Sequence, residues 1–264
     1  MTVTREVLDY YERDEEHRRL REGRDRLEFW RTQDVLRRVL PPAPARVLDV
    51  GGGTGVHAEW LAADGYEVEL LDPVPLHVER AGRLPGVRAR LGDARELPVP
   101  DESVDAVLLL GPLYHLPDRA DRLRALAEAR RVVRPGGPVA AATINRHAAV
   151  HDMIYQRLYL QESYQEAAHA AVADGTLLGP NGFTAYLHDA EEVPGEFADA
   201  GLPGAVRYGL EGAFWLYGDI EDWLDDPGRR DLILQAQRSM ESVPSLIGVS
   251  GHVLTVAHRP APAA

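Results

Sequence analysis

The chain has no cysteine among its 264 residues. This absence excludes disulfide bonds, thiolate nucleophiles and thiolate metal sites. No apolar run reaches about 18 residues, the length that a membrane-spanning helix requires. The first residues, Met1-Thr-Val-Thr-Arg-Glu6, lead into a charged stretch instead of the apolar core of a signal peptide. We therefore expect a cytoplasmic protein that does not interact with membranes.

Positive charge is also scarce. The 29 Lys and Arg residues against 42 Asp and Glu residues give 29 − 42 = −13 with neutral histidine. This balance excludes a generally basic chain that holds polyphosphate by charge alone, although the arginines between Arg18 and Arg38 could form a local basic patch. With 45% hydrophobic and 27% charged residues, the composition is that of an ordinary globular protein.

What the sequence does have is an alternation of short apolar runs and amphipathic segments. We predict strands over 46–50, 67–71, 87–91, 104–110, 139–144, 206–210 and 252–258. Between them we predict helices over 57–63, 75–82, 118–133 and 191–200. Strands separated by helices imply right-handed crossovers and a parallel sheet covered on both faces. The fold class is therefore α/β, with a doubly wound sheet.

A glycine-rich turn, Val47-Leu-Asp-Val-Gly-Gly-Gly-Thr-Gly55, joins the first strand to the next helix. Glycines at such a turn let backbone amides and the helix N-terminus approach a ligand, as in a nucleotide site. The dinucleotide spacing G-x-G-x-x-G fails, because its last position falls on Val56, and no G-x-x-x-x-G-K-[ST] occurs. The loop therefore favours a nucleotide-like cofactor without a pyrophosphate.

The segment from Arg46 to Ile144 resembles the class I S-adenosylmethionine-dependent methyltransferases. Their first motif is similar to Val47–Gly55, with an acidic residue, here Asp49, before the glycines. Four further elements follow in the right order, namely Leu70-Leu-Asp72, Leu91-Gly-Asp-Ala-Arg95, Val104–Leu110 and Arg130-Arg-Val-Val-Arg-Pro-Gly-Gly137. The resemblance implies a Rossmann-like sheet of seven mostly parallel strands, with the last strand antiparallel.

The resemblance also implies S-adenosylmethionine as cofactor and S-adenosylhomocysteine as product. Asp72 would take the ribose hydroxyls, because one carboxylate can accept both protons. Asp93 and the following amide would meet the adenine, and Arg26, with Arg31 as a substitute, would pair with the methionine carboxylate. The cofactor residues that we expect are Arg26, Asp49, Gly51, Gly52, Gly53, Asp72, Pro73, Asp93, Ala94 and Leu110.

The acceptor side is less specific. In Gly111-Pro-Leu-Tyr-His115 the Asn/Asp-Pro-Pro-Tyr pattern of base amino-methyltransferases is missing, which disfavours base N-methylation. The segment looks more like that of methyltransferases of small bacterial metabolites, and this resemblance implies a small molecule as acceptor. His115 is the candidate general base or substrate orienter, with Tyr114 beside it, although packing roles for both stay open. The further substrate-binding candidates are Tyr10, Tyr11, His147, His151 and Tyr155.

His147 and His151 lie four residues apart on a predicted helix and so share one face. We prefer a pocket lining or a solvated face over a metal site, because no H-E-x-x-H pattern is present. The tyrosines of the same segment favour a lid over the substrate, with ordinary packing as the alternative. No metal is expected.

We expect one methyltransferase domain over 1–264. Its parts would be an N-terminal helical lid (1–40), a cofactor-binding half (45–146), a helical lid insertion (147–180), a C-terminal part with a second helical insertion (181–259) and a tail (260–264). We predict methyl transfer to a small molecule by a monomer or homodimer, without nucleic acid. The alternatives are an NAD(P)-dependent oxidoreductase, a non-methylating S-adenosylmethionine-binding protein and a tRNA methyltransferase.

Overall fold

The computed structural model describes residues 19–180 and 182–261. It contains a seven-stranded sheet in the order β3-β2-β1-β4-β5-β9-β8, and β9 is antiparallel to both of its neighbours. The strands are β1 (Arg46–Val50), β2 (Glu67–Asp72), β3 (Val87–Leu91), β4 (Ala106–Leu109), β5 (Pro138–Ile144), β8 (Val206–Gly209) and β9 (His252–His258). The predicted doubly wound, mostly parallel sheet is confirmed.

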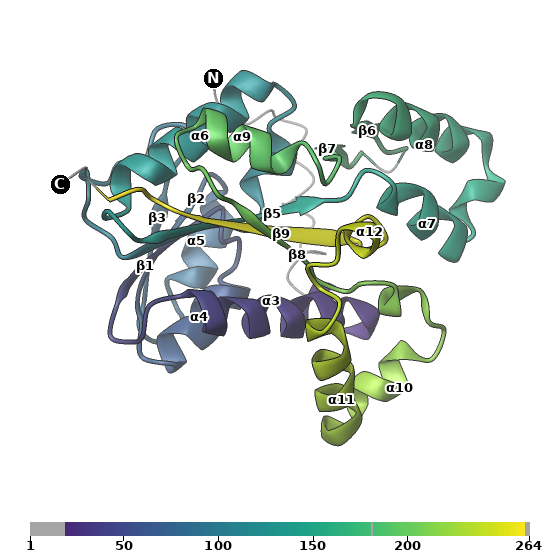
Figure 1. Cartoon of the computed structure of the whole chain (residues 1–264), viewed down its shortest axis with the longest axis horizontal. Helices are drawn as coiled ribbons and strands as arrows, with labels where there is room; N and C mark the ends of the chain where they lie inside the picture. Colours follow the sequence, from purple (N-terminus) through teal and green to yellow (C-terminus); the bar gives the residue numbers. More distant parts are fainter. Residues whose placement is uncertain (1–18, 181, 262–264) are drawn as a thin grey trace.

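Helices cover both faces of this sheet (Figure 1). One face packs against α3 (Arg26–Val39), α4 (Val56–Ala63) and α5 (Pro75–Ala81). The other face packs against α6 (Arg119–Val132) and α9 (Val193–Asp199). Successive side chains of the central strand β4 point to opposite faces of the sheet. Ala106 and Leu108 pack on the α3 side, and Val107 and Leu109 pack on the α6 side. This two-sided burial explains why β4 is apolar throughout.

The sheet reverses its winding between β1 and β4. The chain runs from β1 outward to β2 and β3, then returns to place β4 against the free side of β1. The loops that leave β1 and β4 therefore diverge to opposite faces. In open α/β sheets, the crevice beyond the carboxyl ends of the strands at such a reversal is the place for a ligand.

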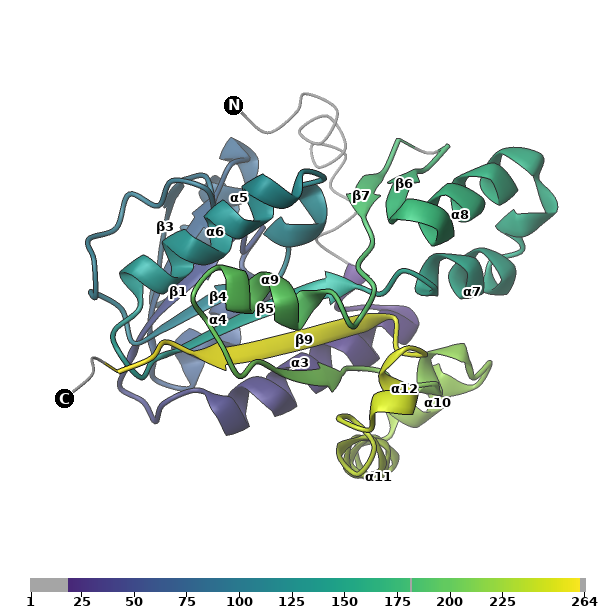
Figure 2. The same cartoon turned by 45° about the horizontal axis from the view of Figure 1, so that its top comes forward.

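Two insertions lie beyond the carboxyl end of β5 (Figures 1 and 2). The first comprises α7 (Ala148–Tyr155), the short helix η3 (Leu158–Leu160), α8 (Glu162–Asp174) and a hairpin of β6 (Thr176–Leu178) and β7 (Thr184–Tyr186). The second comprises η4 (Phe214–Leu216), α10 (Ile220–Asp225), α11 (Pro227–Arg238) and α12 (Pro244–Ile247). Two more short helices are η1 (Gly23–Asp25), before α3, and η2 (Pro112–His115), after β4.

The first insertion is mostly helical over the range 147–180, for which the sequence predicts a helical insertion, but it ends in a hairpin that was not predicted. The last residues of this range form the first strand of the hairpin, and β6 pairs with β7 in antiparallel register. Each of these strands has three residues, which is too short for an alternation of apolar and polar positions to be visible in the sequence.

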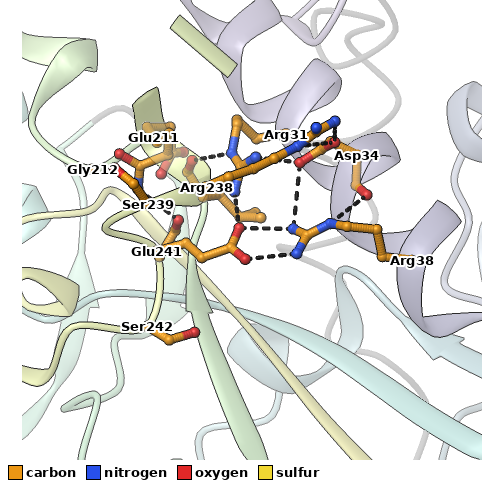
Figure 3. Close-up of polar contacts among 12 residues, drawn as sticks. Arg31, Asp34, Arg38, Glu211, Gly212, Arg238, Ser239, Glu241 and Ser242 are labelled. Carbon is orange, nitrogen blue, oxygen red and sulfur yellow. Dashed lines mark hydrogen bonds and ion pairs between the residues drawn. The ribbon is translucent and has the colours of Figure 1, made fainter. Parts of the chain in front are cut away.

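A buried group of charges joins α3 to the second insertion (Figure 3). Arg31, fully buried, bonds both Asp34 on its own helix and Glu241 just beyond α11. The Arg38 guanidinium donates two hydrogen bonds to the Glu241 carboxylate, over 2.7 and 2.8 Å. Arg238 Nε donates to Asp34 Oδ1 over 2.8 Å. Buried charges are stable only when paired, so these contacts fix the orientation of α11 against α3.

Candidate functional site

The glycine turn between β1 and α4 is crowded on its inner side. Gly51 has a φ of +69°, and a Cβ there would lie 2.6 Å from Pro112 Cγ. A Cβ on Gly52 would lie 2.5 Å from Asp49 Oδ2. Neither position has room for a side chain, so the backbone itself forms the wall that a ligand would meet. The predicted reason for these glycines, close backbone approach, agrees with this geometry.

Asp72, at the end of β2, is fixed at the rim of this turn. Gly53 N donates to its Oδ2 over 2.9 Å, and Val74 N donates to its Oδ1 over 2.9 Å. His77 Nδ1 lies 3.1 Å from the same Oδ1. A carboxylate offers about four lone-pair sites, so these contacts hold Asp72 in place and leave capacity for hydroxyl groups of a ligand.

Asp49 lies beneath the glycine turn and is 1% exposed. Neither of its carboxylate oxygens has a hydrogen-bond partner among the described residues. Burial and, as the smaller cause, the neighbouring Asp72 carboxylate raise the pKa of Asp49 to about 7. An unpaired buried carboxyl is costly, and a cationic group of a ligand would favour its ionised form. Asp49 therefore marks a position suited to positive charge.

A cavity of about 300 Å³ opens at this edge of the sheet. Its lining comes from the carboxyl ends of β1, β2 and β4, from the loop after β3 and from the start of the described chain. Of the predicted cofactor residues, those that line it are Asp49, Gly51, Gly52, Gly53, Asp72, Pro73, Asp93, Ala94 and Leu110. The structure thus brings together nine residues that the sequence placed in four separate motifs.

One end of the cavity is closed by the loop after β3. Asp93 Oδ1 accepts from the Arg95 amide and from Arg95 Nε, each over 2.9 Å. Arg95 Nη1 reaches across to Asp121 Oδ2 on α6 over 2.7 Å. These bonds lower the pKa of Asp93 although burial acts in the opposite direction. The Asp93 loop is therefore a rigid end wall.

Tyr114 and His115 line the cavity from η2, directly after β4. Their rings meet edge to face with centroids 4.6 Å apart, and the His115 ring lies 6.0 Å from that of Phe183 near the hairpin. Burial lowers the pKa of His115 to about 4, against the effect of a hydrogen bond to the Thr184 backbone. The imidazole is therefore uncharged at neutral pH, and one of its ring nitrogens has a lone pair that can accept a proton.

Arg26 does not line this cavity, contrary to the prediction. Its Nε donates to Gly23 O over 2.8 Å, and its Nη1 pairs with Asp225 Oδ1 over 2.7 Å. The helical rotation of α3 turns Arg26 toward α10, and the substitute Arg31 lies in the buried charge group of Figure 3.

The cavity is also lined by polar residues that were not predicted as site residues, among them Arg19, Glu28, Thr32 and His57. Glu28 and Thr32 are four residues apart, hence on one face of α3, and both are buried. A polar pair at this spacing on the buried face of a helix is the signal that could have indicated them.

The three substrate candidates of the first insertion also lie outside the cavity lining. The His151 ring packs edge to face on Trp215 of η4 at 6.4 Å, and the Arg24 guanidinium lies 4.1 Å above the Tyr155 ring. His147 precedes α7. The His151 side chain thus packs against the second insertion and the Tyr155 side chain against η1, long-range contacts that local sequence does not reveal. Tyr10 and Tyr11 lie outside the described residues.

Within residues 19–180 and 182–261, no helix is long and apolar enough to cross a membrane.

Comparison with known proteins places this arrangement in a family. A family model described as a methyltransferase domain matches residues 48–141, which run from within β1 through β2, β3 and β4 into β5. An uncharacterized methyltransferase of Mycobacterium tuberculosis is 48% identical over 101 residues, 38% of this chain. That match spans 40% of the relative's own length.

A longer match is with a demethylmenaquinone methyltransferase of Mycobacterium sp. (strain KMS), which is 31% identical over 185 residues, 70% of this chain and 74% of the relative. Among solved structures, an S-adenosylmethionine-dependent methyltransferase from Methanosarcina mazei has the same fold, with a TM-score of 0.57 at 18% identity. That alignment covers 86% of this chain and 97% of the other. The chain belongs to the methyltransferase domain family, in the class I Rossmann-like group.

Proposed function

We propose that this chain is an S-adenosylmethionine-dependent enzyme that methylates a small-molecule acceptor. The observation that carries the proposal is Asp49, a buried carboxyl with no hydrogen-bond partner among the described residues, which lies under a turn where glycines leave the backbone bare. The cofactor has a cationic sulfonium and an ammonium group, either of which suits that carboxyl. Family membership supports the same cofactor.

The remaining lining residues fit the other parts of that cofactor. Asp72 has acceptor capacity for two ribose hydroxyls, and the Asp93 loop forms a wall with a backbone amide, at Ala94, near the position expected for adenine. No pyrophosphate subsite is needed, in agreement with the failed dinucleotide spacing of the glycines. This fit favours S-adenosylmethionine over NAD(P) as the ligand of the cavity.

The bound cofactor supplies an electrophilic methyl group, so the protein must chiefly align the acceptor and exclude water. Tyr114 and His115 are placed for this because they line the cavity directly after β4. The neutral His115 imidazole can accept a proton from the acceptor as the methyl group is transferred. The Tyr114 hydroxyl can orient the acceptor by a hydrogen bond.

The acceptor is proposed to be a small molecule and not a nucleic acid. The net charge of −13 opposes long contacts with a polyanion, and the loop after β4 is not the Asn/Asp-Pro-Pro-Tyr of base methylation. One relative is named for the methylation of demethylmenaquinone, so hydroquinones belong in the first acceptor panel beside phenols and amines.

The test is a methyl-transfer assay that follows S-adenosylhomocysteine release with this acceptor panel. We expect turnover with at least one acceptor, and His115→Gln should lower kcat by about 10-fold or more while the affinity for S-adenosylhomocysteine stays unchanged. Arg37→Gln, an exposed arginine of α3 that pairs with Asp64, is the control and should keep full activity. Cofactor binding without transfer to any acceptor would favour a non-methylating protein instead.

A further inference from the structure

A buried arginine of α6 holds the segment that leaves η2. Arg122 is 2% exposed, and its Nη1 donates to Leu116 O over 3.0 Å and to Pro117 O over 2.7 Å. Both of these residues line the cavity and directly follow Tyr114 and His115 in the chain. The guanidinium therefore fixes this segment, the η2 exit (residues 116 and 117), through two backbone carbonyl groups.

The other nitrogens of the same guanidinium are bonded to α9, which packs beside α6 (Figures 1 and 2). Arg122 Nε lies 3.0 and 3.1 Å from the two carboxylate oxygens of Glu196, and Nη2 donates to Oε1 over 2.7 Å. Burial opposes the ionisation of Glu196, but contacts with His188 and Arg122 outweigh it and lower its pKa to about 2. A buried guanidinium and a buried carboxylate are stable only as a pair, so Glu196 fixes Arg122 in place.

A third contact joins Arg122 to the hairpin of the first insertion. Its Cζ atom lies 3.8 Å from the centre of the Tyr186 ring in β7, a cation–π contact. The Tyr186 hydroxyl donates to Glu192 Oε2 over 3.2 Å and accepts from Arg146 Nη2 over 3.3 Å. The ring is thus held at its hydroxyl end as well, and β7 is fixed against the guanidinium.

Strand β7 in turn contacts η2. His115 has a hydrogen bond to the Thr184 backbone, and its ring lies 6.0 Å from the Phe183 ring. Tyr114 packs on the apolar core of the first insertion. The η2 exit on one side of His115 and β7 on the other are therefore both bonded to Arg122.

We propose that Arg122 is a positioning residue that ties the η2 exit to α9 and β7 and thereby holds Tyr114 and His115 where they meet the methyl acceptor. This inference rests on the proposed function. The glycine turn and Asp72 are held by other bonds, so the affinity for the cofactor should not depend on Arg122.

The first test is an NMR titration of the His115 imidazole in Arg122→Lys. Lysine keeps a cation beside Glu196, but a single ammonium nitrogen does not reach the carboxylate and both carbonyl groups as the guanidinium fork does. The η2 exit is then freed, and water reaches the imidazole. The pKa of His115, about 4 in the unaltered protein, should rise by about 1 or more toward its ordinary value.

A second arginine of α6 provides the matched control. Arg131 donates to Leu97 O and to Val99 O over 2.9 Å each and pairs with Glu128, but these contacts lie away from the cavity lining. Arg131→Lys should therefore leave the pKa of His115 unchanged. Calorimetric titration of both lysine variants should give an affinity for S-adenosylhomocysteine within about 2-fold of the unaltered protein, which shows that the fold is intact.

A double variant separates the loss of the carbonyl contacts from the effect of an unpaired buried charge. Arg122→Met with Glu196→Gln removes both charges of the pair and should raise the pKa of His115 as Arg122→Lys does. An unchanged pKa in the Arg122 variants, or an equal rise in Arg131→Lys, would overturn the inference. If one Arg122 variant does not fold, which loss of S-adenosylhomocysteine binding would reveal, the other decides the question.

Kinetics with an acceptor from the panel give an independent measurement. Arg122→Lys should lower kcat by about 3- to 10-fold and leave the KM for S-adenosylmethionine unchanged. In the His115→Gln background it should cause little further loss, because Arg122 acts through His115, and full additivity would contradict the inference. Failure of the unaltered protein to bind S-adenosylhomocysteine or to methylate any acceptor would instead overturn the proposed function, whereas an unmoved His115 pKa overturns the inference alone.

Discussion

Asp49 is the residue at which stability and ligand binding are opposed. Its folded-state pKa of about 7 lies above the ordinary aspartate pKa of 3.8, so ionisation destabilises the ligand-free fold. The protein therefore has its full stability from this group below about pH 4 and loses it as the pH rises through 7. Such a carboxyl is retained in a fold when a ligand uses its charge, as we propose for the cationic cofactor.

Replacement of Asp49 by Asn should therefore stabilise the ligand-free protein, by roughly 2 kcal/mol above pH 7 and by little at pH 4. The same change should weaken the binding of S-adenosylmethionine by about 10-fold or more, because the buried negative charge is gone. Thermal unfolding between pH 4 and 8 and calorimetric titration measure the two effects. A variant that is less stable at pH 8 than the unaltered protein would contradict the assigned protonation.

The His115 imidazole is a second buried group whose protonation can be measured. Because burial lowers its pKa to about 4, its imidazole should titrate near pH 4 in the folded protein, and not near the ordinary histidine pKa of 6.5. The folded state then binds fewer protons than the unfolded state, so stability from this group falls as the pH drops from about 6.5 through 4. NMR titration of the imidazole resonance, assigned by its loss in His115→Gln, measures this value. An inflection near pH 6.5 would show that His115 is solvated and not buried.

At the scale of elements, the charge group of Figure 3 determines how the second insertion sits on the sheet. Arg31→Leu removes the buried guanidinium that joins Asp34 to Glu241 and should lower the free energy of unfolding by about 3 kcal/mol. Arg37→Leu is the matched control on the same helix, because the exposed pair of Arg37 with Asp64 should contribute less than about 1 kcal/mol. Urea unfolding of both variants gives the comparison, and equal losses would contradict the assignment.

The elements that the sequence predicts correctly are those with strong local patterns. Buried parallel strands such as β4 are apolar throughout, and glycine turns interrupt them at clear positions. The hairpin of β6 and β7 is missed because its strands are short, and Arg19 is missed because α3 and the segment before it contain many arginines. Which arginine faces the cavity depends on how α3 and the segment before it pack against the sheet, and tertiary packing decides this.

At the scale of the whole molecule, parallel strands explain why nine predicted cofactor residues meet. The carboxyl ends of β1, β2 and β4 and the loop after β3 lie at one edge, so motifs far apart in the sequence must converge there. No comparable rule predicts from the sequence where the side chains of the two insertions lie. The His151 ring packs on the Trp215 ring, and these residues are 215 − 151 = 64 positions apart in the sequence. The Tyr155 ring packs on the Arg24 guanidinium.

Calorimetric titration with S-adenosylmethionine and S-adenosylhomocysteine shows whether this cavity binds the proposed cofactor. We predict micromolar binding of both, with a loss of about 10-fold or more in Asp72→Ala, since Asp72 loses its acceptor oxygens for the ribose. Asp101→Ala, an exposed carboxylate paired with Arg131 away from the cavity, should bind both as the unaltered protein does. Absence of heat with either ligand, or undiminished binding in Asp72→Ala, would contradict this account.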